Sequence, residues 1–320
     1  MVSRPFVPQA VVDLAHARRD ARLRREWAEA DGYRAEIEAA GWVVVDRGVD
    51  FDLRPARPAD IVEDGEVRYG SSESVPSLLD EPDSVAATIV AVGEGDGDSA
   101  WARTVIDRGS GVPVVIVVNG PGARGGPGLA TAGSSAEVVR LATARTIGTA
   151  RNAGIRRATG SVVVLADPAV APGPDVVRDL VEALSDPAVA VAGTIGLVST
   201  GLPRFVVSQE RDVDAVTGTI AFRRSDYRAH GPFDERFQVA GELDAWWSLV
   251  LRDRDEEPPG RAVRVGDLAT DGGGTSVGAT VAAAATADVP GRRRDRYRIL
   301  DRFGGRVDLL SSTGADHPDA

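Results

Sequence analysis

Residues 148–167 read GTARNAGIRRATGSVVVLAD, and this stretch decides the fold class. Its first part has the composition of a helix, which we expect to end at Gly160. The apolar run from Val162 to Leu165 then predicts a buried strand, and an acid, Asp167, follows it. A helix that leads into a buried strand is the repeating unit of α/β proteins, in which ligands bind at the carboxyl ends of the strands. Asp167 is therefore a candidate ligand-binding residue.

The same alternation of helices and strands continues on both sides of this stretch. We expect further strands at 85–93, 111–120 and 188–199, and helices near 98–108, 134–142 and 173–186. Strands separated by helices of this length predict a mostly parallel sheet with helices on both faces. Asn119 also ends a strand, so we expect it at the same edge of the sheet as Asp167.

Changes in composition and in the hydrophobic pattern divide the chain into three parts. We expect an N-terminal appendage at 1–84, the alternating domain at 85–275, and an Ala-rich linker with a C-terminal helix and tail at 276–320. In the appendage, residues 11–40 predict one long helix, Asp64-Gly65 predicts a hairpin turn and residues 71–84 predict a linker. The appendage shows no catalytic constellation, so packing or docking is the role expected for it.

Composition limits the partners. The 320-residue chain has a formal net charge of −11 and a pI near 4.9, so neither nucleic acid nor an anionic membrane surface is an expected partner. No apolar run reaches the roughly 20 residues of a membrane span, and the first residues lack a secretory pattern. Cysteine is absent, which excludes disulfides and fits a cytoplasmic protein. Composition does not indicate an oligomeric state.

A glycine loop after the strand at 111–120 suggests one hypothesis about function. Gly120, Gly122 and Gly125 satisfy the Gly-x-Gly-x-x-Gly pattern of dinucleotide-binding folds, which would imply an oxidoreductase. Pro121 and Pro127 oppose this reading, since they obstruct the helix that should hold the pyrophosphate. The acid expected about 20 residues further on is also missing. We therefore interpret the match of these three glycines to the dinucleotide-binding pattern as a chance match.

Residues 148–167 support a second reading, because they closely resemble the centre of inverting GT-A glycosyltransferases of family 2. Members of that family run Ala-Arg-Asn-x-Gly-Ile, then Ala-x-Gly, then a strand that ends in an acid. Residues 88–120 look like the opening strand, helix and second strand of the family, and residues 213–237, VDAVTGTIAFRRSDYRAHGPFDERF, resemble its acceptor-side segment. The resemblance covers about residues 85–275. It implies a GT-A fold, which is Rossmann-like, and a nucleotide-sugar donor that lies across the strand ends.

The resemblance also implies which residues hold the donor. The segment from Thr88 through Val90 to Gly93, together with Asn119 and Arg151, would line the nucleotide half, and Asp167 would line the diphosphate and sugar half. Asn119 stands where an Asp commonly reads the base. Trp246 and Trp247 follow the base region, and one of them is a candidate for stacking on a sugar. They point about 100° apart on a helix, so we expect at least one of them in the core.

The base region departs from the family pattern. The usual Glu-Asp-x-Asp appears as GELDAWW, so in ungapped register Leu243 occupies the position of the general base. We assign the base to Asp244 and keep Glu242 in reserve, because a carboxylate accepts a proton and leucine cannot.

The metal motif of the family also departs from its pattern. The Asp-x-Asp motif is reduced to Asp167-Pro168-Ala169, and the late His is replaced by a segment that holds Asp271. Two such carboxylates would hold Mn²⁺ or Mg²⁺ weakly, with most ligands coming from the bound donor. We therefore expect a donor-dependent metal site at Asp167 and Asp271, and no tight metal in the free protein.

The predicted function is transfer of a single sugar from a nucleotide-sugar to an acceptor hydroxyl with inversion. The processive Gln-x-x-Arg-Trp motif is missing, which favours single transfer over polymerisation. The main alternative is a catalytically silent GT-A domain that binds a nucleotide or a partner glycosyltransferase, and the missing acids motivate it. The dinucleotide-dependent oxidoreductase is the minor alternative.

Overall fold

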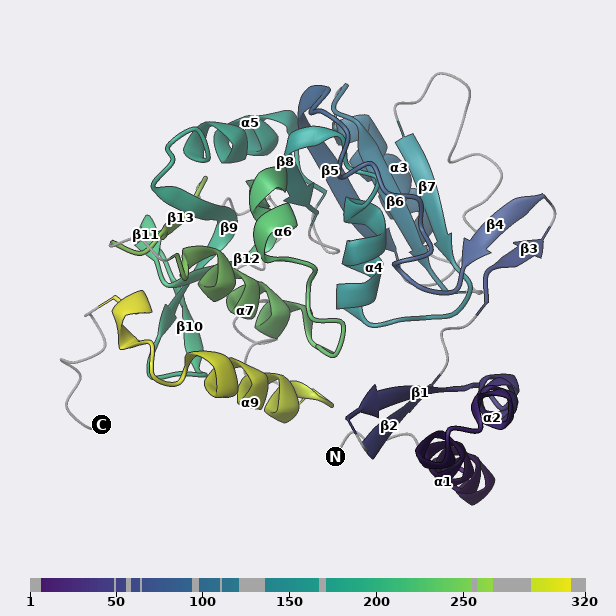
Figure 1. Cartoon of the computed structure of the whole chain (residues 1–320). Coiled ribbons are helices and arrows are strands. Elements are labelled where there is room, and N and C mark those ends of the chain that lie inside the picture. The colour runs from purple at the N-terminus through teal and green to yellow at the C-terminus, as the bar shows by residue number, and fades with distance from the viewer. Residues whose placement is uncertain are drawn as a thin grey trace. The chain divides into compact units, whose positions relative to one another are not determined.

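The computed structural model describes residues 7–48, 50–55, 59–63, 65–93, 98–109, 111–120, 136–166, 171–254, 258–266 and 289–311. The chain forms two compact units, Met1–Asp60 and Ile61–Ala320 (Figure 1).

The first unit contains α1 (Gln9–Arg24), α2 (Trp27–Ala39) and an antiparallel pair of strands, β1 (Trp42–Arg47) and β2 (Asp50–Pro55). The single long helix predicted for residues 11–40 is in fact two helices. Arg25 adopts a left-handed conformation with φ 64°, and its N–H bonds back into the last turn of α1. This cap ends the first helix, because the left-handed conformation cannot continue it. Val11, Ile37 and Trp42 are buried in the small core of this unit.

The second unit is built on one large sheet with the strand order β11-β13-β9-β12-β8-β5-β6-β7-β4-β3, and β10 pairs with β9. The strands are β3 (Ile61–Glu63), β4 (Glu66–Tyr69), β5 (Val85–Gly93), β6 (Val114–Asn119), β7 (Ala136–Leu141), β8 (Gly160–Leu165), β9 (Val189–Ser199), β10 (Phe205–Ser208), β11 (Asp212–Val213), β12 (Ala215–Arg223) and β13 (Arg261–Arg264). Strands β4, β7, β6, β5 and β8 are parallel. Strand β12 is antiparallel to both of its neighbours, β8 and β9. The α/β class is thus confirmed, with a parallel half and a mixed half.

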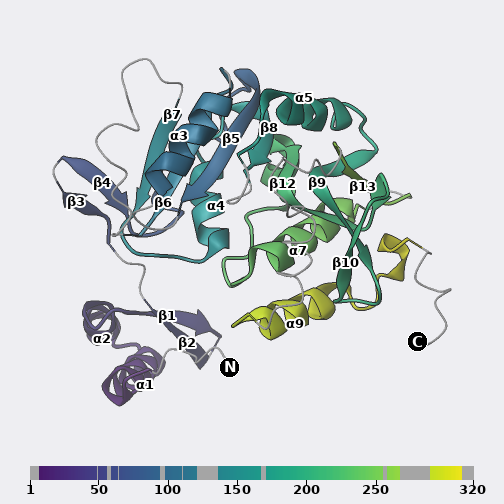
Figure 2. The same ribbon diagram turned by 180° about the vertical axis from the view of Figure 1, so that it is seen from behind.

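Helices cover both faces of this sheet. They are α3 (Asp98–Arg108), α4 (Ile147–Ile155), α5 (Pro174–Ala183), α6 (Arg224–His230), α7 (Ala240–Arg252) and α9 (Arg292–Phe303), followed by a 3₁₀ helix at Val307–Leu309. Figure 1 shows α4, α6 and α7 in front of the sheet, and Figure 2 shows α3 on the opposite face. Strand β5 contributes side chains to the hydrophobic core on both faces of the sheet, since Ile89 packs toward α3 and α5 while Val90 packs under α4. This period-2 alternation is that of a strand buried on both faces.

The helix predicted near 134–142 is a strand, β7. Val139 and Leu141 face one core layer, whereas Ala136 and Val138 face the other. A short apolar run suits a buried strand as well as a helix, and β7 pairs in parallel with both β6 and β4.

The N-terminal appendage ends earlier than predicted, at residue 60 instead of 84. The predicted hairpin is present as β3 and β4, but β4 pairs with β7 and so extends the large sheet. The predicted linker at 71–84 is also packed against this unit. Val75 is 1% exposed, and Arg224, which is buried, donates hydrogen bonds to the carbonyls of Leu78 and Glu81. These contacts make residues 61–84 part of the second unit.

Candidate functional site

The carboxyl ends of β6 and β8 lie at the edge of the sheet where ligands bind in α/β folds. Asn119 ends β6 there, but its side chain is 5% exposed. Its Oδ1 accepts a hydrogen bond of 2.8 Å from the N–H of Arg145, and its Nδ2 donates one of 2.9 Å to the carbonyl of the same residue. Both ends of the amide are therefore used to tie β6 to the segment that enters α4.

Helix α4 comes close to the sheet because its residues are small. A Cβ on Gly154 would lie 2.5 Å from Val90 Cγ1 and 2.7 Å from Val117 Cγ2. Thr88 and Val90, predicted to line the nucleotide, are each 1% exposed. The hydroxyl of Thr88 accepts hydrogen bonds from the N–H groups of Thr159 and Gly160. Thr88 and Val90 thus hold α4 and β8 in place from the interior, and their side chains do not line the surface.

Arg151, on α4, forms an ion pair with Asp244, on α7, in the interior of the unit. Nη1 of the guanidinium contacts Oδ1 of the carboxylate, and the two residues are 4% and 2% exposed. Thr217, at the start of β12, donates a hydrogen bond of 2.7 Å to Oδ2 of Asp244. The predicted base and a predicted donor contact are therefore partners of each other, and both oxygens of Asp244 are engaged.

Glu242 lies in the first turn of α7 and has a different environment. Its Oε1 lies 3.1 Å from Nε of Arg292 and 3.1 Å from Nε of Arg296, both on α9. Burial raises the pKa of the Glu242 carboxyl, and the two guanidinium groups oppose this rise. Among the described residues, Oε2 of Glu242 accepts no hydrogen bond. Arg296, which the sequence did not single out, sits one helical turn after Arg292.

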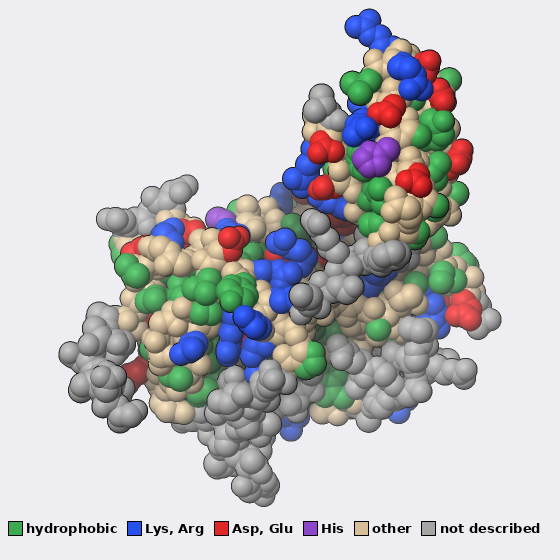
Figure 3. Space-filling view, turned by 90° about the horizontal axis from the view of Figure 1, so that it is seen from below, with side chains coloured by type: hydrophobic (Ala, Val, Ile, Leu, Met, Phe, Trp, Pro, Cys, Tyr) green, Lys and Arg blue, Asp and Glu red, His purple; other side chains and the backbone are tan. Residues whose placement is uncertain are grey.

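Helix α9 is fixed to this region by a second buried carboxylate. Asp295 is fully buried, and its Oδ2 accepts hydrogen bonds from the N–H groups of Gln238 and Val239, which precede α7. Six of the twelve residues of α9 are arginine. Figure 3, which views the molecule from the side of α9, shows arginine side chains gathering on this face. A locally basic surface therefore exists in a protein whose net charge is −11.

The two tryptophans after the base region are both packed. Trp247 is fully buried, and its ring centroid lies 4.6 Å from that of Phe233. Trp246 is 7% exposed and packs between Phe237 and the guanidinium group of Arg302, which lies 5.3 Å from its ring. Trp247 belongs to the core, as expected for one of the pair, and the ring face of Trp246 already has a partner.

Several predicted residues lie outside the described part of the chain. Asp167 and Asp271, expected to share a cation, are among them, as are Gly122 and Gly125 of the glycine loop. Within the ranges that the structure describes, no three His, Asp or Glu side chains form a group that could hold a metal ion. None of the helices described there is long and apolar enough to cross a membrane.

Comparisons with known proteins address the central part of the chain. The model of glycosyl transferase family 2 matches residues 113–242. The crystal structure of GalNAc-T7 with UDP, GalNAc and Mn²⁺ is similar at 14% identity and a TM-score of 0.45, over 57% of this chain and 42% of that chain. A structure of S. aureus TarS 1–349 in complex with UDP-GlcNAc is similar at 15% identity and a TM-score of 0.43, over 72% of this chain and 74% of that chain. No curated protein sequence gives a significant match.

The matched segment begins just before β6 and ends in the first turn of α7. It contains Asn119, Arg151 and Glu242, and it stops before Asp244. The aligned part of the chain spans less than half of the GalNAc-T7 chain. The family match confirms that the central segment of this chain, residues 113–242, is similar to glycosyl transferase family 2.

Proposed function

We propose that this protein transfers one sugar from a nucleotide-sugar donor to an acceptor hydroxyl with inversion. The observation that carries the proposal is the family 2 match, because it covers the sheet edge at β6 and β8 and ends at the carboxylate of Glu242. In this proposal the donor lies across the carboxyl ends of the strands, next to Asn119 and Asp167. Thr88, Val90 and Arg151 support the donor site from within the core. The absence of cysteine fits a reaction in the cytoplasm.

Inverting transfer needs one base and positive charge on the leaving group. The base removes the proton of the acceptor hydroxyl, whose oxygen attacks the anomeric carbon from the face opposite to the diphosphate. The bond from the anomeric carbon to the diphosphate oxygen breaks, and the diphosphate leaves with the electron pair. Arginine side chains bind such oxygens through paired N–H donors, and α9 supplies them beside α7.

Glu242 is better placed than Asp244 to act as this base. Asp244 has both oxygens engaged by Arg151 and Thr217, so taking up a proton there would break a buried ion pair. Burial raises the pKa of Glu242, which brings the carboxylate closer to the basicity that general-base catalysis needs near neutral pH. Its Oε2 is the acceptor that we assign to the incoming hydroxyl.

A catalytically silent, nucleotide-binding domain is the second candidate function. Leu243, which occupies the base position of the family in ungapped register, is fully buried. The next acid, Asp244, stabilises the contact between α4 and α7. A domain that had lost its general base would still need Leu243 and Asp244 to pack α7 in place. The structural roles of these two residues therefore favour the silent domain.

The metal requirement is a separate proposal. Asp167 and Asp271 would bind Mn²⁺ or Mg²⁺ weakly and only with the donor present, since two carboxylates leave most ligand positions to phosphate oxygens and water. Calorimetric titration of Mn²⁺ into the free and the donor-saturated protein tests this, and tight binding to the free protein would contradict it. No step of the transfer described above depends on the metal.

A thermal-shift panel followed by a turnover assay tests the function. Ligands that bind only the native state raise the melting temperature, so nucleotide-sugars should raise it and NAD should not. Release of the nucleoside diphosphate on addition of a sugar acceptor, absent in the Glu242→Gln variant, would support the transferase. Binding without release under every acceptor condition would support the silent domain, and a shift by NAD alone would overturn both.

A further inference from the structure

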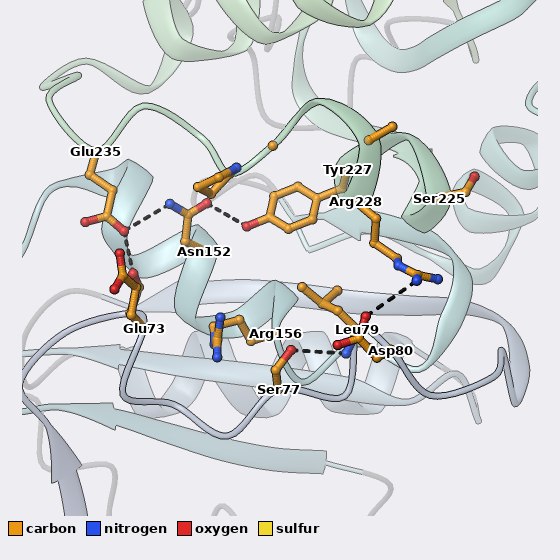
Figure 4. A pocket seen from close by; sticks show the side chains of 14 residues that line it. Glu73, Ser77, Leu79, Asp80, Asn152, Arg156, Ser225, Tyr227, Arg228 and Glu235 are labelled. Carbon is orange, nitrogen blue, oxygen red and sulfur yellow. Dashed lines mark hydrogen bonds and ion pairs between the residues drawn. The ribbon is translucent and has the colours of Figure 1, made fainter.

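A second cavity, whose residues differ from those of the proposed donor site, lies along α4 in the larger unit, between the segment after β4 and α6. It has a volume of about 920 Å³, within the range of ligand-binding pockets. Its lining residues come from the segment after β4, from α4 and its end, and from α6 with the turn that follows it, and they include Ser72, Asp80, Asn152, Arg156, Arg228 and Glu235. Figure 4 shows these side chains around the opening.

The residues that line this cavity distinguish it from the proposed donor site. Helix α6 follows directly on β12, whose last residue, Arg223, pairs with Val162 in the amino-terminal half of β8. Arg156 follows the last turn of α4, which leads into the start of β8. The part of the cavity at Arg156 therefore adjoins the amino ends of the parallel strands, whereas the part at Ser72 and Glu235 lies where β4 and β7 end. None of the residues assigned to sugar transfer lines it.

The floor of the cavity is rigid because Asn152 has every hydrogen-bonding position filled. Its Oδ1 accepts from the hydroxyl of Tyr227 and the N–H of Phe233, each at 2.9 Å. Its Nδ2 donates to the carbonyl of Phe233 and to Oε1 of Glu235, each at 3.0 Å. A ligand that enters would therefore meet a preformed surface, at little cost in ordering the protein.

Two groups in the cavity keep hydrogen-bonding capacity for a ligand. Arg156 uses Nε to donate to the carbonyl of Val75, and its two terminal nitrogens have no hydrogen-bond partner among the described residues. Glu235 uses Oε1 for Ser72 and Asn152, whereas its Oε2 accepts no hydrogen bond in the described part of the chain. Figure 4 shows Arg156 at the end of α4 and Glu235 on the loop at another side of the cavity. A paired donor and a strong acceptor thus line the same cavity.

The charges that line the cavity limit the charge of its ligand. Arg228 contacts Asp80 at 3.4 Å, so this pair compensates itself, while Glu73 and Glu235 add two more carboxylates. A dianion such as a phosphate monoester would meet more negative than positive charge. One carboxylate, however, matches the two terminal nitrogens of Arg156 in geometry, and hydroxyl groups of a ligand can donate to Glu235.

We propose that this cavity is a second, non-catalytic site that binds a sugar acid, a carbohydrate carrying one carboxylate. The carboxylate pairs with Arg156, and sugar hydroxyls donate to Oε2 of Glu235. The wall formed by residues 231–235 leads through Gln238 and Val239 into α7, so an occupied cavity lies against the segment that positions Glu242.

Isothermal calorimetry on the full chain with four probes tests the proposal: glucuronate, glucose, glucose 6-phosphate and acetate. We expect glucuronate to bind at millimolar concentration and at least about tenfold more tightly than any of the others. Arg156→Gln should remove this advantage and leave binding of glucose unchanged. Glu235→Gln keeps an oxygen for Ser72 and Asn152 but replaces the free acceptor by a donor, so it should weaken both sugars.

Arg157→Gln is the matched control. Arg157 is the next residue along the chain, but it pairs with Glu137 on β7 and does not line the cavity. It should bind glucuronate as the unchanged protein does. Because Arg156→Gln also loses the bond to Val75, the melting temperature of each variant is measured without ligand. If Arg156→Gln does not fold, Arg156→Lys, which keeps the charge but not the paired donors, should bind glucuronate about tenfold less tightly.

Three results would overturn the proposal. In the first, glucuronate does not bind. In the second, glucuronate binds equally well to the folded Arg156 and Glu235 variants. In the third, glucose 6-phosphate binds more tightly than glucuronate. Each concerns binding alone, so the outcome is independent of whether the protein transfers sugars.

Discussion

The side chains of Glu242 and Asp244 are two residues apart on α7, yet they serve different purposes because of their neighbours. Asp244 points to the interior, where Arg151 and Thr217 satisfy it. Glu242 points toward α9 and shares one oxygen between two guanidinium groups. The first is a structural ion pair between two helices, and the second is a buried carboxylate that pairs with two arginines.

Substitution of the two acids should therefore have different consequences for turnover. Glu242→Gln should lower turnover at least about 100-fold, and it should also lower the melting temperature, because the buried carboxylate of Glu242 pairs with Arg292 and Arg296. Asp244→Asn should lower the free energy of unfolding by about 3 kcal/mol, because it leaves Arg151 buried without a counter-charge. Its turnover, measured well below the melting temperature, should remain near normal. Loss of turnover in Asp244→Asn alone would show that Asp244 is the base.

The pH dependence of turnover gives an independent check on Glu242. General-base catalysis needs the ionised carboxylate, so the rate should rise with pH through the pKa of Glu242. Because burial raises this pKa above the ordinary value of 4.5 for a glutamate carboxyl, the acid limb of the profile should lie above pH 4.5. A limb below that value would assign the base to another group.

In the first unit, Asp46 couples stability to pH. Arg18 donates two hydrogen bonds to this carboxylate, and they lower the pKa of Asp46 from 3.8 to about 2. The lowered pKa means that Asp46 stabilises the folded state above about pH 3.8 and that this stabilisation is lost as the pH falls through about 2.

Asp46→Asn should consequently lower the melting temperature of this unit at pH 7 and have little effect at pH 2. Differential scanning calorimetry across this range measures the difference. Asp52→Asn is the control, since the pair of Asp52 with Arg47 is more exposed and contributes little. An effect of Asp46→Asn that does not shrink at low pH would exclude the ion pair as its origin.

At the scale of elements, the contact between α4 and the sheet explains the small residues of the family motif. Gly148 lies against the backbone of Asp234 and Glu235, and Gly154 lies against Val90 and Val117. The helix can approach both β5 and the segment before α7 only because these two positions lack a Cβ. This close approach is what brings Arg151 to Asp244.

Gly154→Ala should destabilise the larger unit by about 1–3 kcal/mol, because a methyl group there would overlap two valine side chains in a packed core. Gly173→Ala is the matched control, since no atom lies within 4 Å of the added Cβ and the residue has φ −82°. Chemical denaturation of both variants measures the difference. Equal stability of the two variants would mean that α4 moves away from the sheet at little cost.

At the scale of the whole molecule, residues 61–84 belong to the sheet unit. Strand β4 pairs with β7, Ser72 donates a hydrogen bond to Glu235, and Arg224 holds the segment around Leu78 and Glu81. These contacts cover the edge of β7 and one wall of the second cavity.

A chain that starts at residue 61 should accordingly melt at the temperature of the larger unit in the full chain. A chain that starts at residue 85 should melt several degrees lower or fail to fold, because it leaves β7 as an exposed edge and removes the carbonyls of Leu78 and Glu81 that accept hydrogen bonds from buried Arg224. Calorimetry of the two truncated chains beside the full chain decides this. Equal melting of both would place the boundary at 84, as the sequence alone suggested.

The sequence by itself determined the α/β class, most of the elements of the sheet and the similarity of the central segment to family 2. Periodicity identifies β5, β6, β8 and β9 because each is an apolar run bounded by turn residues, and the motif from Ala150 to Gly160 carries the resemblance to family 2. Periodicity failed at β7, where a short apolar run suits either a helix or a strand. It also missed the break at Arg25, which depends on a single backbone conformation.

Only the tertiary structure decided which functional residues are partners of one another. Arg151 and Asp244 are 93 positions apart in the sequence, and no local pattern indicates that one neutralises the other. The same holds for Glu242 with Arg292 and Arg296, and for Asn119 with the backbone of Arg145. Hydrogen bonds and ion pairs between distant segments are set by how helices pack on a sheet, and spacing along the chain does not record that geometry.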